Sequence, residues 1–375
     1  MSNFKEYNLN TGKLSLNFET EHYRFDSICS LAERLNPKRQ FMFVSKVIGR
    51  YTPTPFSILN SIAKSLSEQI ESKDLEGENN KISLLSLAET GLGLGYLVHN
   101  QLSKDWVNIL RLQTTRRTLS APVLAEFVEP HSHFPNHYIY KSFDKSVNEH
   151  LEQTNTLIIV DDEVTTGNTI KNLVESLKEK LPCLRKVIVL SLTDWSSNLT
   201  VDDVELKTYS LVKGTYTWEQ DSNVPVPHLP YKKSDNVSLT NVTNDHFRLP
   251  SFDSLSDIVS KCKDPKYFNS SDIQIYYDEL IFASLLNCIN KFNNTGKDSV
   301  LLSISSSPLK LNTIIKTKLV LPNLYDSTME SYLYNFDDLL NKGLDSVCLS
   351  IEDAPQSSLI ESLVAWNNVN VFKLL

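Results

Sequence analysis

The chain has 375 residues, more than a single domain usually holds, so we expect two domains that each bury a core. Apolar residues make up 41% and charged residues 22%, a composition that is ordinary for globular proteins and excludes a disordered chain. The 45 acidic and 37 basic residues leave a formal charge of −8, which excludes a global basic field for nucleic acid, so an anionic ligand needs a local site.

Cysteine spacing and hydropathy favour a reduced, cytoplasmic protein. The five cysteines form no Cys-x-x-Cys pair and stand far apart, at Cys29, Cys183, Cys262, Cys288 and Cys348. The polar start MSNFKEYNLN lacks an apolar signal core, and no run approaches the ~18 apolar residues of a membrane helix. We therefore expect neither a membrane nor a nucleic-acid partner.

Short apolar, β-branched runs alternate with segments of helical spacing, which is typical of a parallel α/β sheet with crossover helices. In chain order, the sequence predicts a strand from Phe41 in FMFVSKV, a helix on Leu59, Ile62, Ala63, Leu66 and Ile70, a strand over Ile82–Ala88, a helix on Leu94, Leu97, Val98 and Leu102, a strand over Thr156–Val160, a helix on Ile170, Leu173, Val174 and Leu177, and a strand over Val187–Leu192. The expected fold class is therefore α/β.

Composition changes between about Gln220 and Ser254, where Asn, Ser, Asp and Pro accumulate with little periodicity. Beyond this segment, DELIFASLLNCINKF has helical spacing, and VLLSI and SVCLSI resemble strands. We predict a first domain over residues 1–222, a linker or extended segment over 223–254, and a second, smaller α/β domain over 255–375.

The strongest local signal is TLIIVDDEVTTGNTI, in which a buried strand leads into two carboxylates, a Thr/Gly turn and a helix. Residues 165–169 would present backbone N–H groups and hydroxyls at a helix N-terminus, where the helix dipole favours a phosphate. Gly167 would let the backbone approach that phosphate. Asp161 and Asp162, at the carboxyl end of the strand, could accept hydrogen bonds from ribose hydroxyls. An acidic strand end with a Ser/Thr helix cap is the structural alternative, whereas a P-loop is excluded because no Lys follows the glycine.

This stretch resembles the signature of type I phosphoribosyltransferases, which bind 5-phosphoribosyl pyrophosphate (PRPP). The match covers the hydrophobic strand, the two acidic residues and the T-T-G-x-T turn. The resemblance implies a parallel-sheet fold with a hood, and a PRPP site made of Asp161, Asp162, Glu163, Thr165, Thr166, Gly167, Asn168 and Thr169.

A second segment, LSLAETGLGLGYLVHN, resembles the pyrophosphate-binding loop of the same family and places Ala88, Glu89, Thr90 and Gly91 between a strand and a helix. Backbone amides of such a turn can hold phosphate oxygens. Taken alone, its glycines would more often form only a tight strand–helix turn.

The segment RLQTTRRTLSAPVLAEFVEPHSHFPNHYIY is long and irregular, which predicts a mobile loop that closes over the substrate. Arg116 and Arg117 are candidate clamps on the departing pyrophosphate, with solvated surface arginines as the alternative. Three loop histidines, His131, His133 and His137, are candidate metal ligands together with Glu126 and Glu129. Histidines are also tolerated on surfaces, and their spacing is not a firm zinc pattern.

Taken together, FMFVSKVIGRYTP, LAETGLGLG, LQTTRR, EPHSHFPNH and VDDEVTTGNT resemble the orotate-phosphoribosyltransferase-like branch encoded beside tellurium-resistance and stress genes. That branch carries a C-terminal domain named for a Thr-Arg-Ser-Pro motif, and SLVKGTYTWEQD, DELIFASL, SISSSPLKL and ESYLYNF follow in the expected order. Here the motif is Ser305-Ser306-Ser307-Pro308, without the arginine. An anion-binding role for the motif is thus in doubt, and a structural turn with Pro308 after a strand is the alternative.

The resemblance implies transfer of a phosphoribosyl group from PRPP to a nucleobase-like acceptor, with Mg²⁺ neutralising the pyrophosphate. Asp161, Asp162, Arg116 and Arg117 would act at the reacting centre. The acceptor pocket would include Asp194, Trp195 and Trp218, although each tryptophan is equally compatible with a core or hinge position. Two other functions stay open, a non-catalytic PRPP or nucleotide sensor and a partner-binding protein with the same fold. A homodimer stays open as well.

Overall fold

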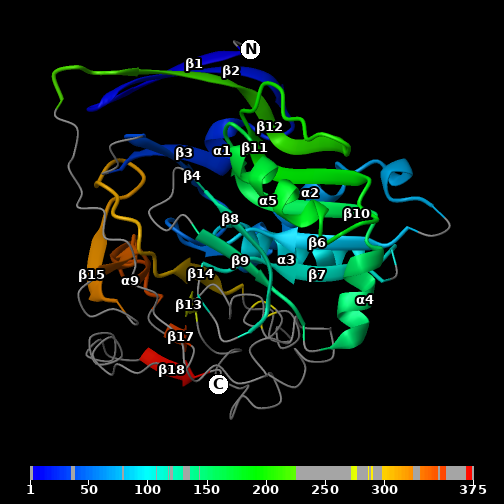
Figure 1. Ribbon diagram of the computed structural model, residues 1–375. Helices are drawn as coiled ribbons and strands as arrows, with labels where there is room; N and C mark the ends of the chain where they lie inside the picture. The colour runs from blue at the N-terminus through cyan, green and yellow to red at the C-terminus, as the bar shows by residue number, and fades with distance from the viewer. Residues whose placement is uncertain are drawn as a thin grey trace. The chain divides into compact units, whose positions relative to one another are not determined.

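The computed structural model describes residues 3–34, 39–77, 80–106, 108–116, 118, 121–129, 136–142, 144–224, 272–276, 286, 289, 298–323, 330–344, 347–351 and 369–373. Its elements, labelled in Figure 1, are β1 (Phe4–Leu9), β2 (Gly12–Glu21), α1 (Phe25–Ile28), β3 (Cys29–Glu33), β4 (Phe41–Ser45), β5 (Thr54–Pro55), α2 (Phe56–Ser67), η1 (Ser72–Asp74), β6 (Ile82–Ser86), α3 (Gly91–Leu102), β7 (Leu110–Gln113), β8 (Val123–Val128), β9 (Asn136–Tyr140), α4 (Lys145–Gln153), β10 (Thr156–Val164), α5 (Asn168–Lys178), β11 (Lys186–Asp194), β12 (Glu205–Gln220), β13 (Ile273–Tyr276), β14 (Val300–Ser303), β15 (Lys318–Pro322), β16 (Glu330–Tyr334), α9 (Asp337–Leu340), β17 (Val347–Ile351) and β18 (Val369–Lys373).

The chain forms two compact units that interleave along the sequence. Unit 1 comprises Met1–Ile28, Asn36–Gln40 and Ile62–Ser251, and unit 2 comprises Cys29–Leu35, Phe41–Ser61 and Phe252–Leu375. This division differs from the consecutive regions 1–222, 223–254 and 255–375 predicted from composition. The physical reason lies inside unit 2, where β5 pairs with β14 although about 245 residues separate them. The predicted linker lies almost wholly outside the described residues.

Unit 1 is built on a seven-stranded, mostly parallel sheet in the order β1-β2-β12-β11-β10-β6-β7. Strands β12, β11, β10, β6 and β7 are mutually parallel, whereas β2 pairs antiparallel with β12 and β1 antiparallel with β2. Every residue of β6 and the first five residues of β10 are buried, as expected for parallel strands covered on both faces. The α/β class predicted from the sequence is confirmed.

Helices cover both faces of the unit 1 sheet around β6 and β10 (Figure 1). On one face, Leu157 and Ile159 pack with the apolar sides of α4, α5 and the β8–β9 hairpin in one buried cluster. On the other face α3 lies so close that a Cβ atom on Gly95 would stand 3.4 Å from the Cβ atom of Val160. Because side chains alternate along a strand, the run of apolar residues in β10 supplies both faces. This packing fixes the carboxyl ends of β6 and β10.

Unit 2 contains a second, smaller sheet in the order β18-β17-β13-β14-β5. Strands β18, β17, β13 and β14 are parallel, and β5 closes the edge in antiparallel orientation. A separate buried cluster joins Ala32, Val44 and Tyr51 from the early segments to Leu309, Ile315 and Tyr334 from the late ones. The predicted second α/β region is therefore present, together with early segments of the chain. In the parts of the chain described above, no helix is long and apolar enough to cross a membrane.

Candidate functional site

The candidate site lies at the carboxyl edge of the unit 1 sheet, where β6, β7 and β10 end side by side. The backbone N–H of Leu87, just after β6, donates to the carbonyl of Val160 in β10 at 3.0 Å. The N–H of Thr114, just after β7, donates to the carbonyl of Ser86 at 2.9 Å. Open α/β sheets bind ligands at this edge. The two segments that resemble a phosphoribosyltransferase site, 88–91 and 161–169, therefore meet there.

The predicted strand, turn and helix around residues 161–169 are all present. β10 runs four residues further than predicted, through both aspartates to Val164, and α5 begins at Asn168. Gly167 caps α5 with φ +77°, a left-handed conformation that L side chains rarely adopt. Thr166 and Asn168 are exposed, Thr165 and Thr169 half-buried. The helix N-terminus and these hydroxyls are thus available to an anion.

The two aspartates differ in their partners. One carboxylate oxygen of Asp162 accepts the hydroxyl of Thr90 at 2.7 Å, which ties β10 to the 88–91 turn. Asp161 accepts the backbone N–H of Asp162 at 2.9 Å. Burial, reinforced by the carboxylates of Asp162 and Glu129, raises the pKa of Asp161 well above its usual range. A proton, a cation or hydroxyl donors would relieve this repulsion.

Glu163, the third acidic residue of the motif, is held by an arginine that the sequence does not single out. Arg39 donates from Nη2 to Oε1 of Glu163 at 2.8 Å, and only 16% and 15% of the two side chains are exposed. Little solvent screens this pair. Because 124 residues separate the partners, no local pattern could have revealed the contact.

The 88–91 turn approaches β10 closely. A Cβ atom on Gly91 would stand 2.6 Å from the carbonyl oxygen of Val160, so only glycine fits there without a shift. The N–H of Ala88 donates to the hydroxyl of Thr114 at 2.8 Å, and the peptide bond between Ala88 and Glu89 is cis. The turn is therefore held from β10 on one side and from the segment after β7 on the other.

Part of the predicted loop after residue 111 is regular structure. β8 and β9 form an antiparallel hairpin, and Thr115 forms an isolated bridge with Tyr138 that joins β9 to the segment after β7. The prediction of an irregular loop is corrected here, because LAEFV and HYIY have enough apolar alternation to pair as strands. The hairpin packs in the same buried cluster as α5. Residues 130–135 lie outside the described parts.

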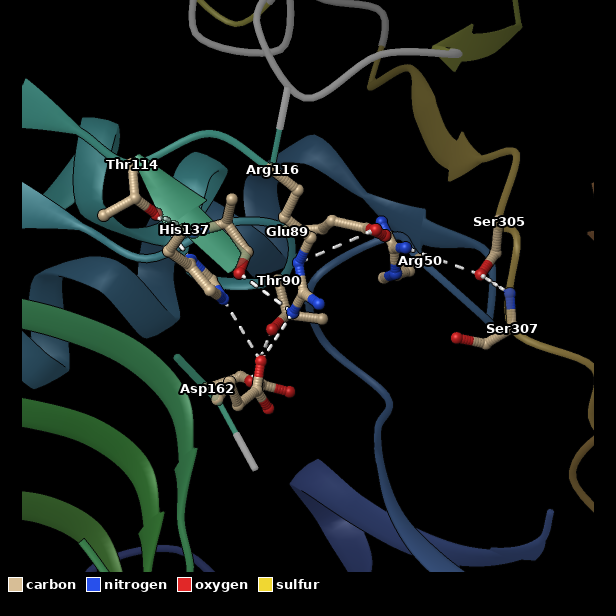
Figure 2. A network of polar contacts seen from close by, with 11 residues as sticks. Arg50, Glu89, Thr90, Thr114, Arg116, His137, Asp162, Ser305 and Ser307 are labelled. Atoms are coloured by element: carbon tan, nitrogen blue, oxygen red, sulfur yellow. Dashed lines mark hydrogen bonds and ion pairs between the residues drawn. The ribbon is translucent and has the colours of Figure 1, made fainter. Parts of the chain in front are cut away.

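Arg116 is held beside the 88–91 turn by acidic and carbonyl oxygens (Figure 2). Its Nη2 donates to Oε2 of Glu129 at 2.7 Å and to the carbonyl of Ala88 at 3.4 Å, and its Nε lies 4.0 Å from Oε1 of Glu89. The Arg116 side chain is 16% exposed, so it is not a solvated surface arginine. Burial would raise the pKa of Glu129, but Arg116 and His137 together lower it to about 2. The second predicted arginine, Arg117, lies outside the described residues.

His137 uses both ring nitrogens within this network. Nδ1 lies 3.1 Å from the hydroxyl of Thr114, and Nε2 lies 3.2 Å from Oε2 of Glu129. The ring is 1% exposed and stacks on Phe127 with centroids 4.8 Å apart. His137 is therefore a buried histidine whose two ring nitrogens both lie within hydrogen-bond distance of protein groups. The other two candidate histidine ligands, His131 and His133, lie outside the described residues. Within the described ranges, no group of three or more His, Cys, Asp or Glu side chains is arranged to hold a metal ion.

The predicted acceptor residues do not come together as one pocket. Trp195 is 3% exposed and packs against Phe18 and Phe25, with ring centroids 6.0 and 5.7 Å away, so it is a core residue. Trp218 follows Lys213, the partner of Asp194 on β12, by five residues, roughly 17 Å along an extended strand. Asp194 lies at the carboxyl edge, beside the end of β10. The backbone of Trp195 follows it there, but the Trp195 ring belongs to the aromatic core.

Asp194 is 1% exposed, and one of its carboxylate oxygens accepts both the backbone N–H and the hydroxyl of Ser196, at 2.9 and 2.6 Å. The other oxygen, Oδ2, contacts no hydrogen-bond donor among the described residues. A buried carboxylate oxygen without a donor is costly for the fold. Such an atom is a candidate contact for a ligand donor.

In unit 2, the Ser305–Pro308 segment follows β14 as a hydrogen-bonded turn. Ser305 accepts the N–H of Ser307 at 3.1 Å, and the hydroxyl of Tyr334 donates to the carbonyl of Ser307 at 2.6 Å. Arg50, which is 6% exposed, donates from Nη2 to the hydroxyl of Ser305 at 3.4 Å. An arginine from a distant segment thus contacts the motif that lacks its own.

Acid is expected to lower the free energy of unfolding as the pH falls from about 6.5 toward 4, in part through His137. Burial, followed by the charge of Arg116, lowers the pKa of this ring from 6.5 to about 4. The unfolded chain therefore binds the proton first, at a cost on the order of 3 kcal/mol once both forms would be protonated. Denaturant unfolding of the wild type and of His137→Gln, between about pH 6.5 and 4.5, should show a shallower pH dependence for the variant. Equal slopes would contradict the buried neutral ring, because His99 and His150, whose pKa values burial also lowers, are common to both proteins.

Several known proteins are similar to parts of this chain. Among curated proteins, the adenine phosphoribosyltransferase of Mycoplasmopsis agalactiae is 38% identical over 64 residues, which cover 17% of this chain and 38% of that protein. Among solved structures, the adenine phosphoribosyl transferase of Trypanosoma brucei, in complex with AMP, pyrophosphate and ribose-5-phosphate, has a TM-score of 0.27 and 11% identity over 37% of this chain and 53% of that one. The hypoxanthine phosphoribosyltransferase of Trypanosoma cruzi, in complex with its product IMP, has a TM-score of 0.26 and 15% identity over 41% and 75% of the two chains.

The chain thus spans under two fifths of the curated relative and about half of the Trypanosoma brucei chain. A family model described as Phosphoribosyl transferase matches residues 28–213 of this chain. Both segments of the candidate site, 88–91 and 161–169, fall inside this range. Over residues 28–213, the chain is similar to the phosphoribosyl transferase family.

Proposed function

We propose that the chain is a PRPP-dependent phosphoribosyltransferase that moves the phosphoribosyl group to a nucleobase-like acceptor and releases pyrophosphate. One observation carries this proposal. The Asp161–Asp162 pair lies between the Gly167 helix cap and the 88–91 turn, and the 2.7 Å hydrogen bond from Thr90 to Asp162 joins the two segments. A ligand with phosphate at both ends of a ribose fits this order of groups.

Each part of PRPP has a group to receive it. The backbone N–H groups and hydroxyls of residues 165–169 would hold the 5′-phosphate at the N-terminus of α5. Asp161 and Asp162 would accept the ribose hydroxyls. The guanidinium of Arg116, whose Nη2 lies 3.4 Å from the Ala88 carbonyl, would hold the pyrophosphate together with amides of the 88–91 turn. The amides of Ala88 and Gly91 are not among them, because they already donate to Thr114 and Leu87.

The reaction would break the bond between carbon 1 of the ribose and the pyrophosphate oxygen, and form a bond between carbon 1 and a nitrogen of the acceptor, which loses its proton. Positive charge develops on the ribose as the first bond breaks. The carboxylates of Asp161 and Asp162 would stabilise this charge, while Arg116 would stabilise the negative charge of the leaving pyrophosphate. The protein's contribution is therefore orientation and electrostatics rather than covalent attack.

Because the site is surrounded by acidic side chains, we propose that PRPP binds together with Mg²⁺. Asp161, Asp162, Glu89 and Glu129 surround the position of the pyrophosphate, and Arg116 already pairs with Glu129 at 2.7 Å. PRPP would add further negative charge to this acidic surrounding. Carboxylate and phosphate oxygens are the ligands that Mg²⁺ prefers, usually with few from the protein. When bound, the ion would neutralise the pyrophosphate and so favour its departure.

The acceptor would be a heterocycle that presents an N–H donor to Oδ2 of Asp194. This oxygen is buried at the carboxyl edge beside β10 and contacts no donor in the described parts of the chain. A ligand N–H would satisfy it, and an acceptor without that donor would leave it unpaired. Stacking on Trp195 is not part of the proposal, since its ring belongs to the aromatic core.

We further propose, from the sequence resemblance, that the chain belongs to the orotate-phosphoribosyltransferase-like branch beside tellurium-resistance and stress genes and carries a C-terminal Thr-Arg-Ser-Pro-type domain. Its role would lie in nucleotide metabolism in the cytoplasm, without a nucleic-acid partner. The Ser305–Pro308 turn at the end of β14 is hydrogen-bonded, and Nη2 of Arg50 lies 3.4 Å from the hydroxyl of Ser305. These contacts support a structural role for that motif in unit 2.

Pyrophosphate release from PRPP tests the proposal, with adenine, hypoxanthine, guanine, orotate and uracil as acceptors. We expect turnover with at least one of them in the presence of Mg²⁺, and its loss when the ion is chelated. PRPP binding without turnover across the panel would favour a sensor with the same fold over an enzyme. Absence of both binding and turnover would overturn the proposal.

A further inference from the structure

Three side chains connect the pyrophosphate side of the site into one chain of hydrogen bonds (Figure 2). Thr114 accepts the N–H of Ala88 at 2.8 Å and lies 3.1 Å from Nδ1 of His137. His137 in turn lies 3.2 Å from Glu129, and Glu129 accepts from Arg116 at 2.7 Å. The backbone of the 88–91 turn and the guanidinium of Arg116 are thus joined through one imidazole.

The direction of these bonds follows from the chemistry of the groups. The Thr114 hydroxyl already accepts the N–H of Ala88, and its single proton can be donated to Nδ1 of His137. Nδ1 is then an acceptor, so the ring proton lies on Nε2 and is donated to the carboxylate of Glu129. In this path Thr114 accepts from Ala88 and donates to His137, and His137 accepts from Thr114 and donates to Glu129. A neutral imidazole can accept at one ring nitrogen and donate at the other, as this path requires.

The hairpin makes this chain rigid. Phe127 on β8 is the cross-strand partner of His137 on β9, and the two rings stack at 4.8 Å with 21° between their planes. The N–H groups of Thr115 and Tyr138 each donate to the other's carbonyl, at 2.9 and 2.8 Å. Thr114 and His137 are both buried, at 0% and 1% exposure. The imidazole therefore has little freedom to turn away from its two partners.

The other described histidines with buried or half-buried rings, His99 and His150, differ in what they contact. Nε2 of His99 lies 2.9 Å from the carbonyl of Ile109, and Nε2 of His150 lies 3.0 Å from the carbonyl of Ile82. Ile82 begins β6, at the opposite end of that strand from the site. His137 alone among these three joins two groups that point at the proposed pyrophosphate position.

We propose that His137 is a positioning residue that fixes the 88–91 turn, through Thr114, and Arg116, through Glu129, in the geometry that binds pyrophosphate. This inference rests on the proposed function, since it assigns the pyrophosphate half of the PRPP site. It extends that function by naming a unit of buried Thr114, buried His137 and half-buried Glu129 that supports the 88–91 turn and Arg116. The 5′-phosphate half, residues 165–169, belongs to a different segment and does not depend on this unit.

Calorimetry with three probes separates the two halves of the site. The probes are PRPP, inorganic pyrophosphate and ribose 5-phosphate, each with Mg²⁺, and ribose 5-phosphate lacks the pyrophosphate group. The variants are His137→Asn, which keeps an acceptor near Nδ1, His137→Gln, which keeps a donor near Nε2, and Thr114→Val, which removes the hydroxyl. Matched controls are His150→Gln, for a half-buried histidine, and Thr154→Val, for a threonine that is also 0% exposed.

We expect each His137 and Thr114 variant to lose about tenfold in affinity for PRPP and for pyrophosphate, the loss of one buried hydrogen bond. Ribose 5-phosphate should bind with unchanged affinity, and both control variants should bind all three probes like the wild type. Equal losses for all three probes, or no loss with any, would overturn the positioning role. A wild type that binds ribose 5-phosphate but neither PRPP nor pyrophosphate would refute the proposed function itself. A wild type that binds none of the probes would refute it as well.

Discussion

Replacing Asp161 and Asp162 together by asparagine is expected to abolish PRPP binding and yet to stabilise the free protein. Each carboxylate that accepts a ribose hydroxyl contributes about 1.5–3 kcal/mol, so the pair corresponds to roughly a 10²- to 10⁴-fold loss of affinity. Calorimetry with PRPP and Mg²⁺ measures this loss.

The gain in stability follows from the position of Asp161. Burial and the carboxylates of Asp162 and Glu129 raise the pKa of Asp161 in the folded chain. The folded state then holds the proton more tightly than the unfolded state, so the free energy of unfolding falls as the pH rises above the ordinary range for a carboxyl group. Asparagine carries no charge and removes this cost. The melting temperature of the double variant at neutral pH should therefore exceed that of the wild type.

Asp202 and Asp203 provide a matched control. They are also adjacent aspartates, but they are exposed and lie in the turn before β12, at the amino end of the parallel strands. Asp202→Asn with Asp203→Asn changes the net charge equally and should leave PRPP affinity unchanged. Equal affinity of the wild type and the Asp161/Asp162 variant would refute the site assignment, whereas equal losses in both double variants would point to net charge rather than to the site.

Gly167→Ala is expected to weaken PRPP and ribose 5-phosphate together, at least tenfold, while pyrophosphate binding is spared. Gly167 caps α5 at φ +77°, and a methyl group there would stand 2.5 Å from Cδ1 of Leu199. The Leu199 side chain can move to relieve this contact, but the left-handed φ stays strained for alanine. A shift of the backbone out of this conformation would turn the N–H groups of residues 165–169 away from the ligand. Calorimetry with the same three probes measures the pattern.

Gly343→Ala separates backbone strain from the effect on the ligand. Gly343 has the same φ of +77°, but a Cβ atom there would meet nothing within 4 Å. Both variants should lose about 1 kcal/mol of stability from the left-handed conformation. Only Gly167→Ala should lose ligand affinity. Unchanged affinity of Gly167→Ala for ribose 5-phosphate would contradict the placement of the 5′-phosphate at residues 165–169.

The elements that carry the site could be predicted from the sequence because their signals are local. The apolar runs before Ala88 and Asp161 belong to strands buried on both faces, and each is followed by a glycine-bearing turn and an apolar helical stripe. The predicted strands and helices around β6, α3, β10, α5 and β11 are therefore confirmed, with ends that differ by a few residues. Boundaries moved because β10 continues through the polar residues 161–163, where pairing with β11 outweighs polarity.

Features that depend on distant partners could not be predicted. The β1–β2 hairpin pairs with the long strand β12, whose mixed polar sequence shows little periodicity by itself. Arg39 meets Glu163 only because the sheet of unit 1 brings them together. The early segment from Cys29 to Ser61 joins the late part of the chain in unit 2, and no composition change marks that pairing.

Within the candidate site, the sequence singled out residues that we propose to contact the ligand, but not every residue that holds them in place. Arg116 was singled out, while Thr114, which holds the 88–91 turn, was not. His137 was singled out as a metal candidate, and its actual partners, a hydroxyl and a carboxylate, lie 23 and 8 positions away. The sequence allowed Trp195 either to stack on a ligand or to lie in the core, and the structure places its ring in the core against Phe18 and Phe25. The sequence could not decide because these two neighbours come from the start of the chain.

A crystal soaked with PRPP and Mg²⁺ would show where each part of PRPP binds. We expect the 5′-phosphate on the N–H groups and hydroxyls of residues 165–169, the ribose hydroxyls on Asp161 and Asp162, and the pyrophosphate between the 88–91 turn and Arg116. PRPP bound anywhere else on the chain, or bound with its pyrophosphate at the N-terminus of α5, would contradict this placement.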